Sequence, residues 1–363
     1  MRLLTVIGAR PQFIKAAPFS AVFRQQHKEI LVHTGQHYDA NMSDVFFNEL
    51  GIPKPEYNLG VGSGNHGVQT GRMLEKIEEL LLCEKPDGML VYGDTNSTLA
   101  GALAASKLHI PVFHIEAGLR SFNMIMPEEQ NRILTDHIST ILSCPTQTAV
   151  DNLAREGITK GVHNTGDVMY DAVLYNIEIA KSRFSWDKLI SDMHVLEGSV
   201  LNLTAKNYYL ATVHRAENTD DKRRLCAIFE AFSEMDMPVL MPIHPRTRKL
   251  ILQYDIIPTN VILIEPVGYL PMLMLTSNAK KVLTDSGGLQ KEAWMLETPC
   301  VTIREQTEWI ETLECGWNVL VHVNKEDILN KAMNTKPDIN KRGNPFGDGH
   351  AAEKIVEVLK DYK

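Results

Sequence analysis

Two series of short apolar runs constrain the fold of this chain more than any other feature, because each run is followed by a segment with helical spacing. The runs are Leu3–Gly8, Glu29–Gly35, Met89–Gly93, Val112–Gly118 and Ile141–Pro145 in the first series, and Tyr208–His214, Val239–His244, Val261–Glu265, Lys281–Thr284 and Pro299–Arg304 in the second. Apolar strands that alternate with helices are typical of parallel sheets covered on both faces. A polar, irregular stretch at Gly166–Asn207 separates the series. The sequence therefore predicts two doubly wound α/β domains.

The last segment of the chain predicts a helix that returns to the first domain. Within Gly349–Lys363, the apolar residues Ala352, Ile355, Val356 and Leu359 share one face at helical spacing. We expect this helix to cross back and pack on the first domain. The predicted boundaries are therefore residues 1–166 with 349–363 for the N-terminal domain, and 167–348 for the C-terminal domain.

The charge balance argues against a nucleic-acid partner. Among 363 residues, 37 are Lys or Arg and 45 are Asp or Glu, a formal net charge of −8, whereas nucleic-acid-binding domains are generally basic. No apolar stretch reaches the ~20 residues of a membrane helix, and the N-terminus lacks a secretory signal pattern. The five cysteines have no metal-binding spacing and lie mostly among apolar residues. We expect a cytoplasmic protein with reduced core thiols and no metal site, in which a few placed cations and amides would hold any phosphate.

The residues after the first run suit an anion. In open α/β sheets ligands bind outside the carboxyl ends of the strands, so we expect the site residues at these positions. Pro11 fits the first turn of a helix, which leaves Arg10 beside the unpaired N–H groups and Lys15 one turn further on. The alternative is that both are surface cations at a helix start.

Carboxylates follow the next strands of the first domain. Asp94 comes after the third run, Glu116 stands near the end of the fourth, and Glu129 shares a helical face with Arg132 and Asp136. A carboxylate at the end of an apolar strand is costly to bury unless it is paired or functional. Asp94 as a helix cap and Glu129 in an intrahelical ion pair remain alternatives. The three carboxylates are nevertheless a plausible acid/base set.

The second domain offers a phosphate site. Glycines that open a helix let backbone amides approach a pyrophosphate, and Ser286, Gly287 and Gly288 follow the fourth run of the second series. Glu292 lies about two turns further along, where a carboxylate can accept ribose hydroxyls. The remaining candidates for substrate binding or catalysis in this half are His214, Arg215, His244, Tyr269 and Arg304.

One glycine motif is a false lead. Gly62–Gly67 matches the dinucleotide-binding pattern GxGxxG, but Pro53 and Pro55 precede it, and prolines argue against a central strand at that point. We interpret the segment as a mobile glycine loop near the substrate rather than as a nicotinamide site.

Together these motifs resemble the non-hydrolysing UDP-N-acetylglucosamine 2-epimerase family. The matching segments are Gly8–Lys15, Gly93–Thr98, His114–Arg120, Pro127–Arg132, His214–Glu217, Thr284–Glu292 and Asn344–Gly349. The resemblance implies the GT-B architecture, with two Rossmann-like domains, the active site in the cleft between them and a homodimer. It also implies that Arg10, Lys15, Asp94, Glu116, Glu129 and His214 are functional, and that Ser286, Gly287 and Glu292 bind UDP.

The chemistry implied by the resemblance needs neither a metal nor a redox cofactor. Family members eliminate UDP in the anti sense to give 2-acetamidoglucal, and then add UDP back after C2 is reprotonated on its other face. A C2–H without an adjacent carbonyl is a poor acid, so cationic character at C1 must develop as UDP leaves. Carboxylates can stabilise that charge and handle the proton, while cations and amides hold the pyrophosphate.

Two departures from the family pattern concern the sugar. Members acting on plain UDP-GlcNAc usually have Thr-Glu-Arg-Pro-Glu where this chain has Thr307–Glu311, with Trp309 and Ile310 in place of Arg and Pro, and they tend to have Gln-His-Arg where this chain has Gln36–Tyr38. Both departures resemble the branch acting on UDP-2,3-diacetamido-2,3-dideoxy-glucuronate. They predict that Trp309 offers the sugar an aromatic surface, although packing between helices is the alternative. Arg120 or Arg304 would then bind the C6 carboxylate.

Two other classes of function compete with an epimerase. A GT-B glycosyltransferase using a UDP-sugar donor should show an acceptor surface, which is not evident in the sequence. A non-catalytic nucleotide-sugar sensor would have no use for several carboxylates at strand ends. The sequence therefore favours the epimerase.

Overall fold

The computed structural model describes residues 1–35, 54–196 and 203–362. The chain forms two compact units: the first is Met1–Ala172 together with Asn344–Lys363, and the second is Val173–Gly343. The chain thus enters the second unit six residues later than the predicted boundary at 166/167 and leaves it five residues before the predicted boundary at 348/349.

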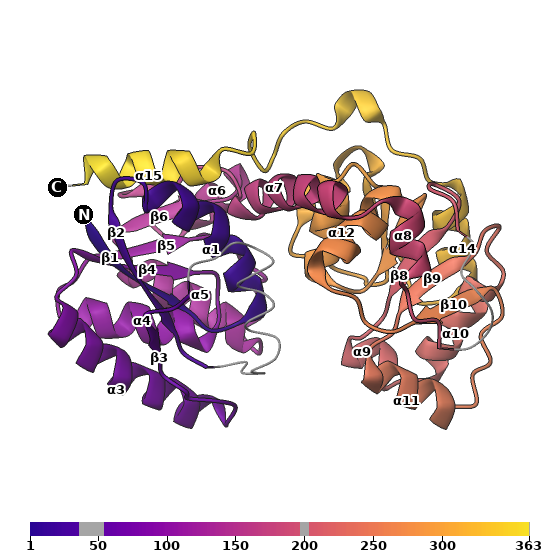
Figure 1. Cartoon of the computed structure of the whole chain (residues 1–363), viewed down its shortest axis with the longest axis horizontal. Coiled ribbons are helices and arrows are strands. Elements are labelled where there is room, and N and C mark those ends of the chain that lie inside the picture. The colour runs from indigo at the N-terminus through magenta and orange to yellow at the C-terminus, as the bar shows by residue number, and fades with distance from the viewer. Residues whose placement is uncertain (36–53, 197–202, 363) are drawn as a thin grey trace. The chain divides into compact units, whose positions relative to one another are not determined.

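The first unit is built on a parallel sheet, which has seven strands within the described residues, in the order β3-β2-β1-β4-β5-β6-β7 (Figure 1). The strands are β1 (Arg2–Ile7), β2 (Lys28–His33), β3 (Tyr57–Asn58), β4 (Gly88–Tyr92), β5 (Val112–Ile115), β6 (Ile141–Cys144) and β7 (Val162–Asn164). The middle strand, β4, is buried at every residue, as a strand covered on both faces must be.

Helices cover both faces of this sheet. They are α1 (Arg10–Phe23), α3 (His66–Glu84), α4 (Asn96–Lys107), α5 (Pro127–Ile138), α6 (Gln147–Arg155) and α15 (Ala351–Asp361). The helices α3, α4 and α5 lie on one face, and α15 packs beside α1 on the other (Figure 1). The four apolar residues predicted to share a face of α15 are all buried.

The second unit repeats the design with a parallel sheet of six strands among its described residues, in the order β10-β9-β8-β11-β12-β13. The strands are β8 (Tyr209–Thr212), β9 (Val239–Pro242), β10 (Val261–Ile264), β11 (Lys281–Thr284), β12 (Cys300–Thr302) and β13 (Asn318–Leu320). The helices are α8 (Trp186–Ser191), α9 (Ala216–Thr219), α10 (Lys222–Ser233), α11 (Pro245–Gln253), α12 (Tyr269–Asn278), α13 (Gly287–Met295) and α14 (Lys325–Asn334), with 3₁₀ turns η1 (Ile310–Gly316) and η2 (Ile339–Lys341). Apolar side chains of β8, β9, α10 and α14 form its main core.

Strand order explains where ligands can bind. In the first unit the chain moves outward from β1 toward β3 and then returns to β4 on the other side of β1; in the second it does the same from β8 to β10 and back to β11. At such a switch point, the loops after the two neighbouring strands diverge and leave a crevice at their carboxyl ends. The loops after β4, β8 and β11 contain the predicted residues Asp94, His214, Arg215 and Ser286, and the helices after β1 and β11 begin at Arg10 and Gly287.

The structure corrects two expectations, one about the stretch between the two series and one about the cysteines. The segment Gly166–Asn207 is not irregular, because it contains α8 and the 16-residue helix α7 (Val168–Arg183), whose apolar residues recur at helical spacing. Cys83 is exposed near the end of α3, so it is not a core thiol.

Within the described part of the chain, none of the helices has the length and apolar character needed to cross a membrane.

Candidate active site

Gln12 ties the loop after β1 to the loop after β4. Its Oε1 accepts hydrogen bonds from the backbone N–H groups of Gly8 (2.8 Å) and Ala9 (3.0 Å), and its Nε2 donates to the Tyr92 carbonyl (2.8 Å). Gly8 has no room for a side chain, because a Cβ there would collide with the hydroxyls of Ser97 and Thr34. Sequence reasoning missed Gln12, although a glutamine at the third helical position is a capping-box signal.

Lys15 forms a buried ion pair with Glu116, so these two predicted residues do meet. Glu116 directly follows β5 and has a φ of +70°, in the left-handed region that residues other than glycine seldom adopt. The Ser143 carbonyl on β6 accepts hydrogen bonds from the N–H groups of Glu116 and Ala117, both at 3.1 Å, and fixes this turn. Backbone strain of this kind clusters at functional sites.

Arg132 joins two other predicted carboxylates. Its Nε donates to Asp94 Oδ2 at 2.9 Å, and its NH1 forms an ion pair with Glu129. Glu129 also accepts hydrogen bonds from the N–H groups of Ser121 and Phe122. Lys15, Glu116, Asp94, Arg132 and Glu129 therefore form one group of charges, called here the carboxylate cluster.

The two carboxylates that Arg132 joins differ in acidity. Burial raises the pKa of Asp94, and repulsion from Glu116 adds to the effect against the attraction of Arg132 and Lys15. Burial also opposes ionisation of Glu129, but hydrogen bonds from the Ser121 and Phe122 amides and from Arg132 outweigh it and lower its pKa. Asp94 is also the more accessible, with its side chain 30% exposed against 1% for Glu129. Asp94 is thus the better placed of the two to exchange a proton.

Amide side chains that sequence reasoning missed support the backbone of Asp94. Asn131 on α5 donates to the Asp94 carbonyl at 2.9 Å and to Asn96 Oδ1 at 3.3 Å. Asn96 in turn donates to Gln69 Oε1 at 2.8 Å, and Gln69 donates to the Gly62 carbonyl at 2.8 Å. The glycine segment before α3 is therefore connected to the cluster by hydrogen bonds.

Asp285 organises the loops of the second unit. Its buried carboxylate accepts hydrogen bonds from the N–H groups of His214 (3.1 Å) and Arg215 (3.0 Å), and from the Asn218 side chain (3.1 Å). The His214 ring lies with Nδ1 3.5 Å from Asp285 Oδ1 and is 45% exposed. Asp285 was not predicted as a site residue, although its place at the end of β11 was a usable signal.

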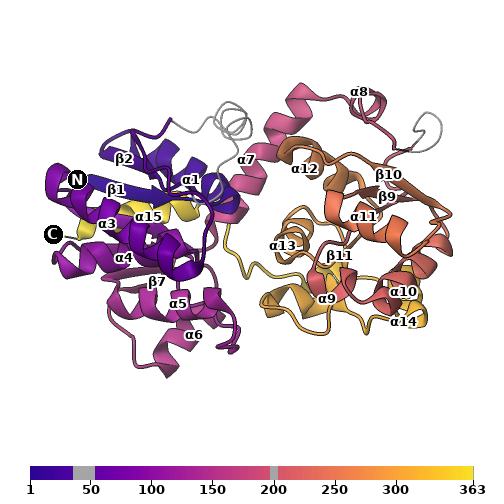
Figure 2. The same cartoon turned by 90° about the horizontal axis from the view of Figure 1, so that it is seen from below.

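The beginning of α13 suits an anion. Ser286 caps this helix by accepting a hydrogen bond from the Leu289 N–H at 3.3 Å, while Gly287 and Gly288 supply first-turn N–H groups that have no acceptor within a helix. A Cβ on Gly287 would collide with the Glu308 carboxylate, and Arg215 NH2 lies 3.6 Å from the same point. Both α9 and α13 begin beside the end of β11 (Figure 2).

The other predicted residues of this unit lie as follows. His244 is exposed and caps α11 by accepting the Arg246 N–H at 3.2 Å, Tyr269 is buried at the first position of α12, and Glu292 is half-buried on α13. Arg304 forms an ion pair with Glu308 at 3.0 Å. In the first unit, Arg10 begins α1, but its side chain is outside what the structure describes, as is the segment Gln36–Asp39.

Two expectations about the sugar are wrong in detail. Trp309 is only 6% exposed, and the Lys291 ammonium lies 3.8 Å from its ring centre, so the tryptophan packs inside the unit rather than offering an aromatic surface. Arg120 is buried, and its guanidinium is bound by both Asp136 and Glu156. It is therefore not available to a substrate carboxylate.

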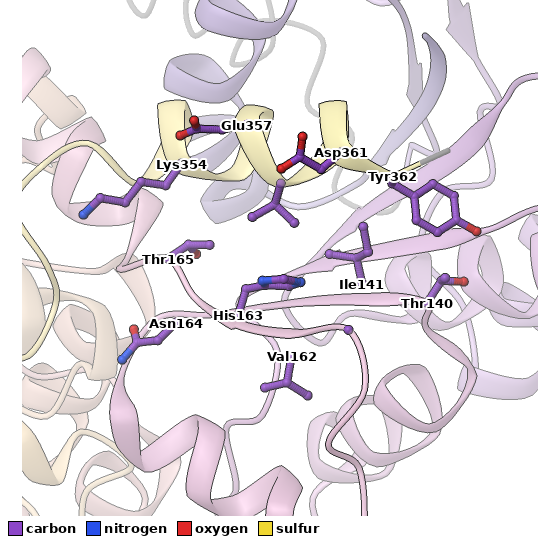
Figure 3. Close-up of a pocket in the computed structure, with 12 residues that line it drawn as sticks. Thr140, Ile141, Val162, His163, Asn164, Thr165, Lys354, Glu357, Asp361 and Tyr362 are labelled. Atoms are coloured by element: carbon purple, nitrogen blue, oxygen red, sulfur yellow. The ribbon is translucent and has the colours of Figure 1, made fainter.

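A pocket of ≈ 860 Å³ lies elsewhere in the first unit (Figure 3). Residues of β7 such as His163 and Asn164 line one side, and Lys354 and Glu357 of α15 line another. None of the predicted site residues contributes to it. The predicted chemistry therefore belongs to the strand ends and not to this pocket.

The fold and these two groups of side chains define a class of protein: two doubly wound α/β units, one with a cluster of ionisable groups and the other with a glycine-opened helix suited to phosphate. The chain belongs to the UDP-N-acetylglucosamine 2-epimerase family, whose model matches residues 21–360. The family predicted from the motifs is thus confirmed. Its members are UDP-sugar 2-epimerases, which are isomerases.

Relatives match the chain along its whole length. A UDP-N-acetylglucosamine 2-epimerase homolog of Methanococcus maripaludis is 54% identical, over 99% of this chain and 100% of that protein. The UDP-2,3-diacetamido-2,3-dideoxy-D-glucuronate 2-epimerase of Pseudomonas aeruginosa is 52% identical, over 99% of each. The crystal structure of Methanocaldococcus jannaschii UDP-GlcNAc 2-epimerase in complex with UDP-GlcNAc and UDP is 44% identical, covers 99% of both chains and has a TM-score of 0.85. The predicted GT-B-like, two-domain α/β fold is confirmed.

Proposed function

We propose that this enzyme inverts C2 of a UDP-2-acetamido sugar through elimination and re-addition of UDP. The observation that carries the proposal is the carboxylate cluster, which joins two cations and three carboxylates in one unit. In the forward step the C2–H and C1–O bonds break, a protein group takes the proton, and UDP leaves with the C1–O electron pair. Reprotonation of C2 on the opposite face and return of UDP to C1 complete the inversion.

Asp94 is our choice for the group that removes the C2 proton. The raised pKa and partial exposure of Asp94 suit a group that must both accept and release a proton. Glu116, paired with Lys15, is the second acid/base candidate and would serve the other face of the ring. Glu129 acts instead as a positioning residue, because Arg132 and two backbone amides already hold its carboxylate.

The second unit would hold UDP. The first-turn amides of Gly287 and Gly288, with Arg215 close by, supply donors for a pyrophosphate, and His214 is exposed and oriented by Asp285. Lys15 and Arg10 would stabilise the charge that develops on the leaving group. Resemblance to the family assigns the ribose hydroxyls to Glu292. His244 and Tyr269 remain candidates for substrate binding.

The sugar that we propose is UDP-2,3-diacetamido-2,3-dideoxy-glucuronate rather than plain UDP-GlcNAc. The whole-length likeness to the P. aeruginosa enzyme supports this choice, whereas the burial of Trp309 removes the argument from an aromatic surface. Arg120 is bound by two carboxylates, whereas Arg304 is paired with Glu308, so Arg304 is our preferred cation for the C6 carboxylate.

We also propose that the enzyme is a homodimer that acts in the cytoplasm. Self-association is supported by large apolar side chains that are exposed on the loop before α5, namely Phe122, Met124 and Ile125. Light scattering from the wild-type protein and from Ile125→Asp should give the mass of a dimer and of a monomer, respectively. The cytoplasmic location rests on the sequence alone.

Solvent exchange tests the reaction directly. In deuterated water, without any acceptor, the enzyme should incorporate deuterium at C2 of its substrate and produce the C2 epimer. The diacetamido uronate should have the higher kcat/KM when it is compared with UDP-GlcNAc. A glycosyltransferase would release UDP only with an acceptor or by hydrolysis, and a sensor would bind the sugar without exchange, so either result would contradict the proposal.

A further inference from the structure

His114 lies on β5, two residues before Glu116, and faces two hydrogen-bond acceptors. It is the third residue of β5 and its side chain is fully buried. Its Nδ1 lies 2.7 Å from Asp136 Oδ1, and its Nε2 lies 2.8 Å from the Gly93 carbonyl oxygen. Both distances are those of hydrogen bonds. Each ring nitrogen must therefore donate a proton if its partner can only accept one.

With Asp136 ionised, only the doubly protonated ring satisfies both contacts. A backbone carbonyl cannot donate, and neither can an ionised carboxylate, whereas a neutral imidazole has one N–H and one lone pair. Either neutral tautomer would therefore place a nitrogen lone pair against an oxygen at hydrogen-bond distance in a buried site. An imidazolium donates from both nitrogens and leaves no such conflict.

The groups around Asp136 keep its carboxylate ionised. Asp136 Oδ2 accepts hydrogen bonds from the Gly118 N–H (3.1 Å) and from Arg120 NH1 (2.7 Å). Burial disfavours this charge, but His114 and Arg120 outweigh it and lower the pKa of Asp136. Glu156, an exposed residue at the end of α6, also binds Arg120, so the set contains two cations and two anions. Cys144 on β6 stays a neutral thiol, because burial and the Asp136 charge raise its pKa.

The Gly93 carbonyl that His114 faces belongs to the turn that presents Asp94. The N–H of Gly93 donates to the Ile115 carbonyl of β5 at 3.0 Å, and its φ is +60°. Both polar groups of the Gly93 backbone are therefore held from β5, the strand that Glu116 directly follows. A Cβ on Gly93 would lie 3.0 Å from Glu116 Oε2, so the turn and the carboxylate are packed closely.

We propose that His114 is a positioning residue held as an imidazolium, which fixes the Gly93 turn and thereby sets Asp94 against Glu116. This inference rests on the proposed function of those two carboxylates. His114 does not touch the substrate. It sets the distance over which the proton must move, and displacements of about 1 Å can cost ~10²-fold in rate. Nucleotide binding, which we assign to the second unit, should not depend on it.

The protonation state can be measured on the wild-type enzyme by nitrogen NMR with labelled histidine. At about pH 8, where histidines with ordinary pKa values near 6.5 are neutral, one ring should keep both N–H protons. That signal should vanish in His114→Gln and in Asp136→Asn. If every histidine ring in the wild-type protein were neutral at that pH, the proposal would be overturned, and this result needs no variant to fold.

Kinetics test the positioning role. The variant His114→Phe removes both donors and should lower kcat by about 10²-fold, with KM and UDP affinity changed little. In His114→Gln the side chain can still donate to Gly93, so part of kcat should return. The matched control is His163→Phe on β7 of the same sheet, for which we expect wild-type kcat. A fall in UDP affinity equal to the fall in kcat, or no recovery in the glutamine variant, would contradict the assignment.

The two proposals fail in different ways. A wild-type enzyme that does not exchange C2–H of either UDP sugar would refute the proposed function, while the NMR result would still report the state of His114. A wild-type enzyme that epimerises normally but has only neutral histidines would refute the positioning by an imidazolium and leave the function intact.

Discussion

Lys15 and Glu116 are 101 residues apart in the sequence and form a buried ion pair. Lys15 comes from the helix after β1, and Glu116 from the turn after β5, so the pair must cross the loop after β4 that lies between those strands. Gly93 in that loop makes the approach possible, because a hypothetical Cβ there would lie 3.7 Å from Lys15 Nζ and 3.0 Å from Glu116 Oε2. The two residues therefore depend on a third position that has no side chain.

Removing the lysine should slow the reaction far more than it weakens binding. In Lys15→Met the Glu116 carboxylate is left buried without its partner, and the leaving group loses a cation. Loss of a donor aimed at developing charge costs ~10²–10³-fold in kcat. Steady-state kinetics should show this fall with a much smaller change in KM. Unchanged kcat would remove Lys15 from the mechanism. The control for the loss of a lysine is Lys249→Met on α11, which should keep the wild-type kcat.

A side chain at Gly93 should disturb both stability and activity. The Gly93→Ala change places a Cβ against Glu116 and forces an alanine to a φ of +60°. We expect a loss of about 1–3 kcal/mol in the free energy of unfolding and a fall in kcat. Gly64→Ala is a matched control, because a Cβ at Gly64 meets no atom within 4 Å among the described residues. Equal effects of the two variants on unfolding would show that the Gly93 contact is unimportant.

The carboxylates should respond differently to isosteric substitution. If Asp94 is the C2 base, Asp94→Asn should lower deuterium uptake at C2 by ~10²-fold or more. Glu129→Gln removes the charge that holds Arg132 and the 121–122 turn, so it should also reduce the thermal stability of the protein. Asp94→Asn should change thermal stability less. Normal exchange by Asp94→Asn would show that Asp94 is not the C2 base.

Acid should destabilise the first unit through His33. Burial lowers the pKa of His33 to about 4 from 6.5, so between these values the unfolded chain binds more protons than the folded one. The stability that neutral, buried His33 contributes is therefore fully present above pH 6.5 and is lost as the pH falls toward 4. Between pH 7 and pH 5 the loss from this residue is roughly 2 kcal/mol.

Urea unfolding at both pH values measures this effect. The difference in unfolding free energy between pH 7 and pH 5 should be smaller in His33→Asn than in the wild type. The exposed His350 provides the control, since His350→Asn should keep the wild-type difference. The same pH dependence in all three proteins would show that His33 titrates normally.

An alanine at Gly287 should weaken UDP binding without touching the carboxylate cluster. The new Cβ would collide with Glu308 and shift the first turn of α13. Isothermal titration with UDP should show a lower affinity in Gly287→Ala. In Gly288→Ala the new Cβ would meet only Ser286 Oγ, at 4.0 Å, so this variant should lose less affinity for UDP. Equal UDP affinity of Gly287→Ala and the wild type would place the pyrophosphate elsewhere.

The sequence predicted the central strands well and the sheet edges poorly. Each of the ten apolar runs contains a strand, because buried parallel strands need continuous apolar residues. The strands β3, β7 and β13 were missed. They have two or three residues each and lie at sheet edges, where one side is unpaired and the apolar signal is weak.

The site was predictable in its charged residues but not in the groups that hold them. Lys15, Asp94 and Glu116 could be found because they follow strands. Gln12 contacts Tyr92 80 residues away, and Asp285 contacts His214 71 residues away. Such contacts depend on which strands become neighbours, which no local pattern records. The Trp309 prediction erred for a related reason, since this ring packs against Lys291 of α13, a contact that the local sequence does not record.

The hydrogen bonds of Gln12 have a consequence for how this enzyme could be altered. Because its carboxamide already occupies the N–H groups of Gly8 and Ala9, the turn after β1 has little left to offer a phosphate. Under the proposed function, recognition of the nucleotide then belongs to one half of the chain and the reactive chemistry to the other. Changing nucleotide affinity by grafting the β11–α13 segment of a relative should therefore leave the proton-transfer groups as they are. The polypeptide is, in this respect, modular.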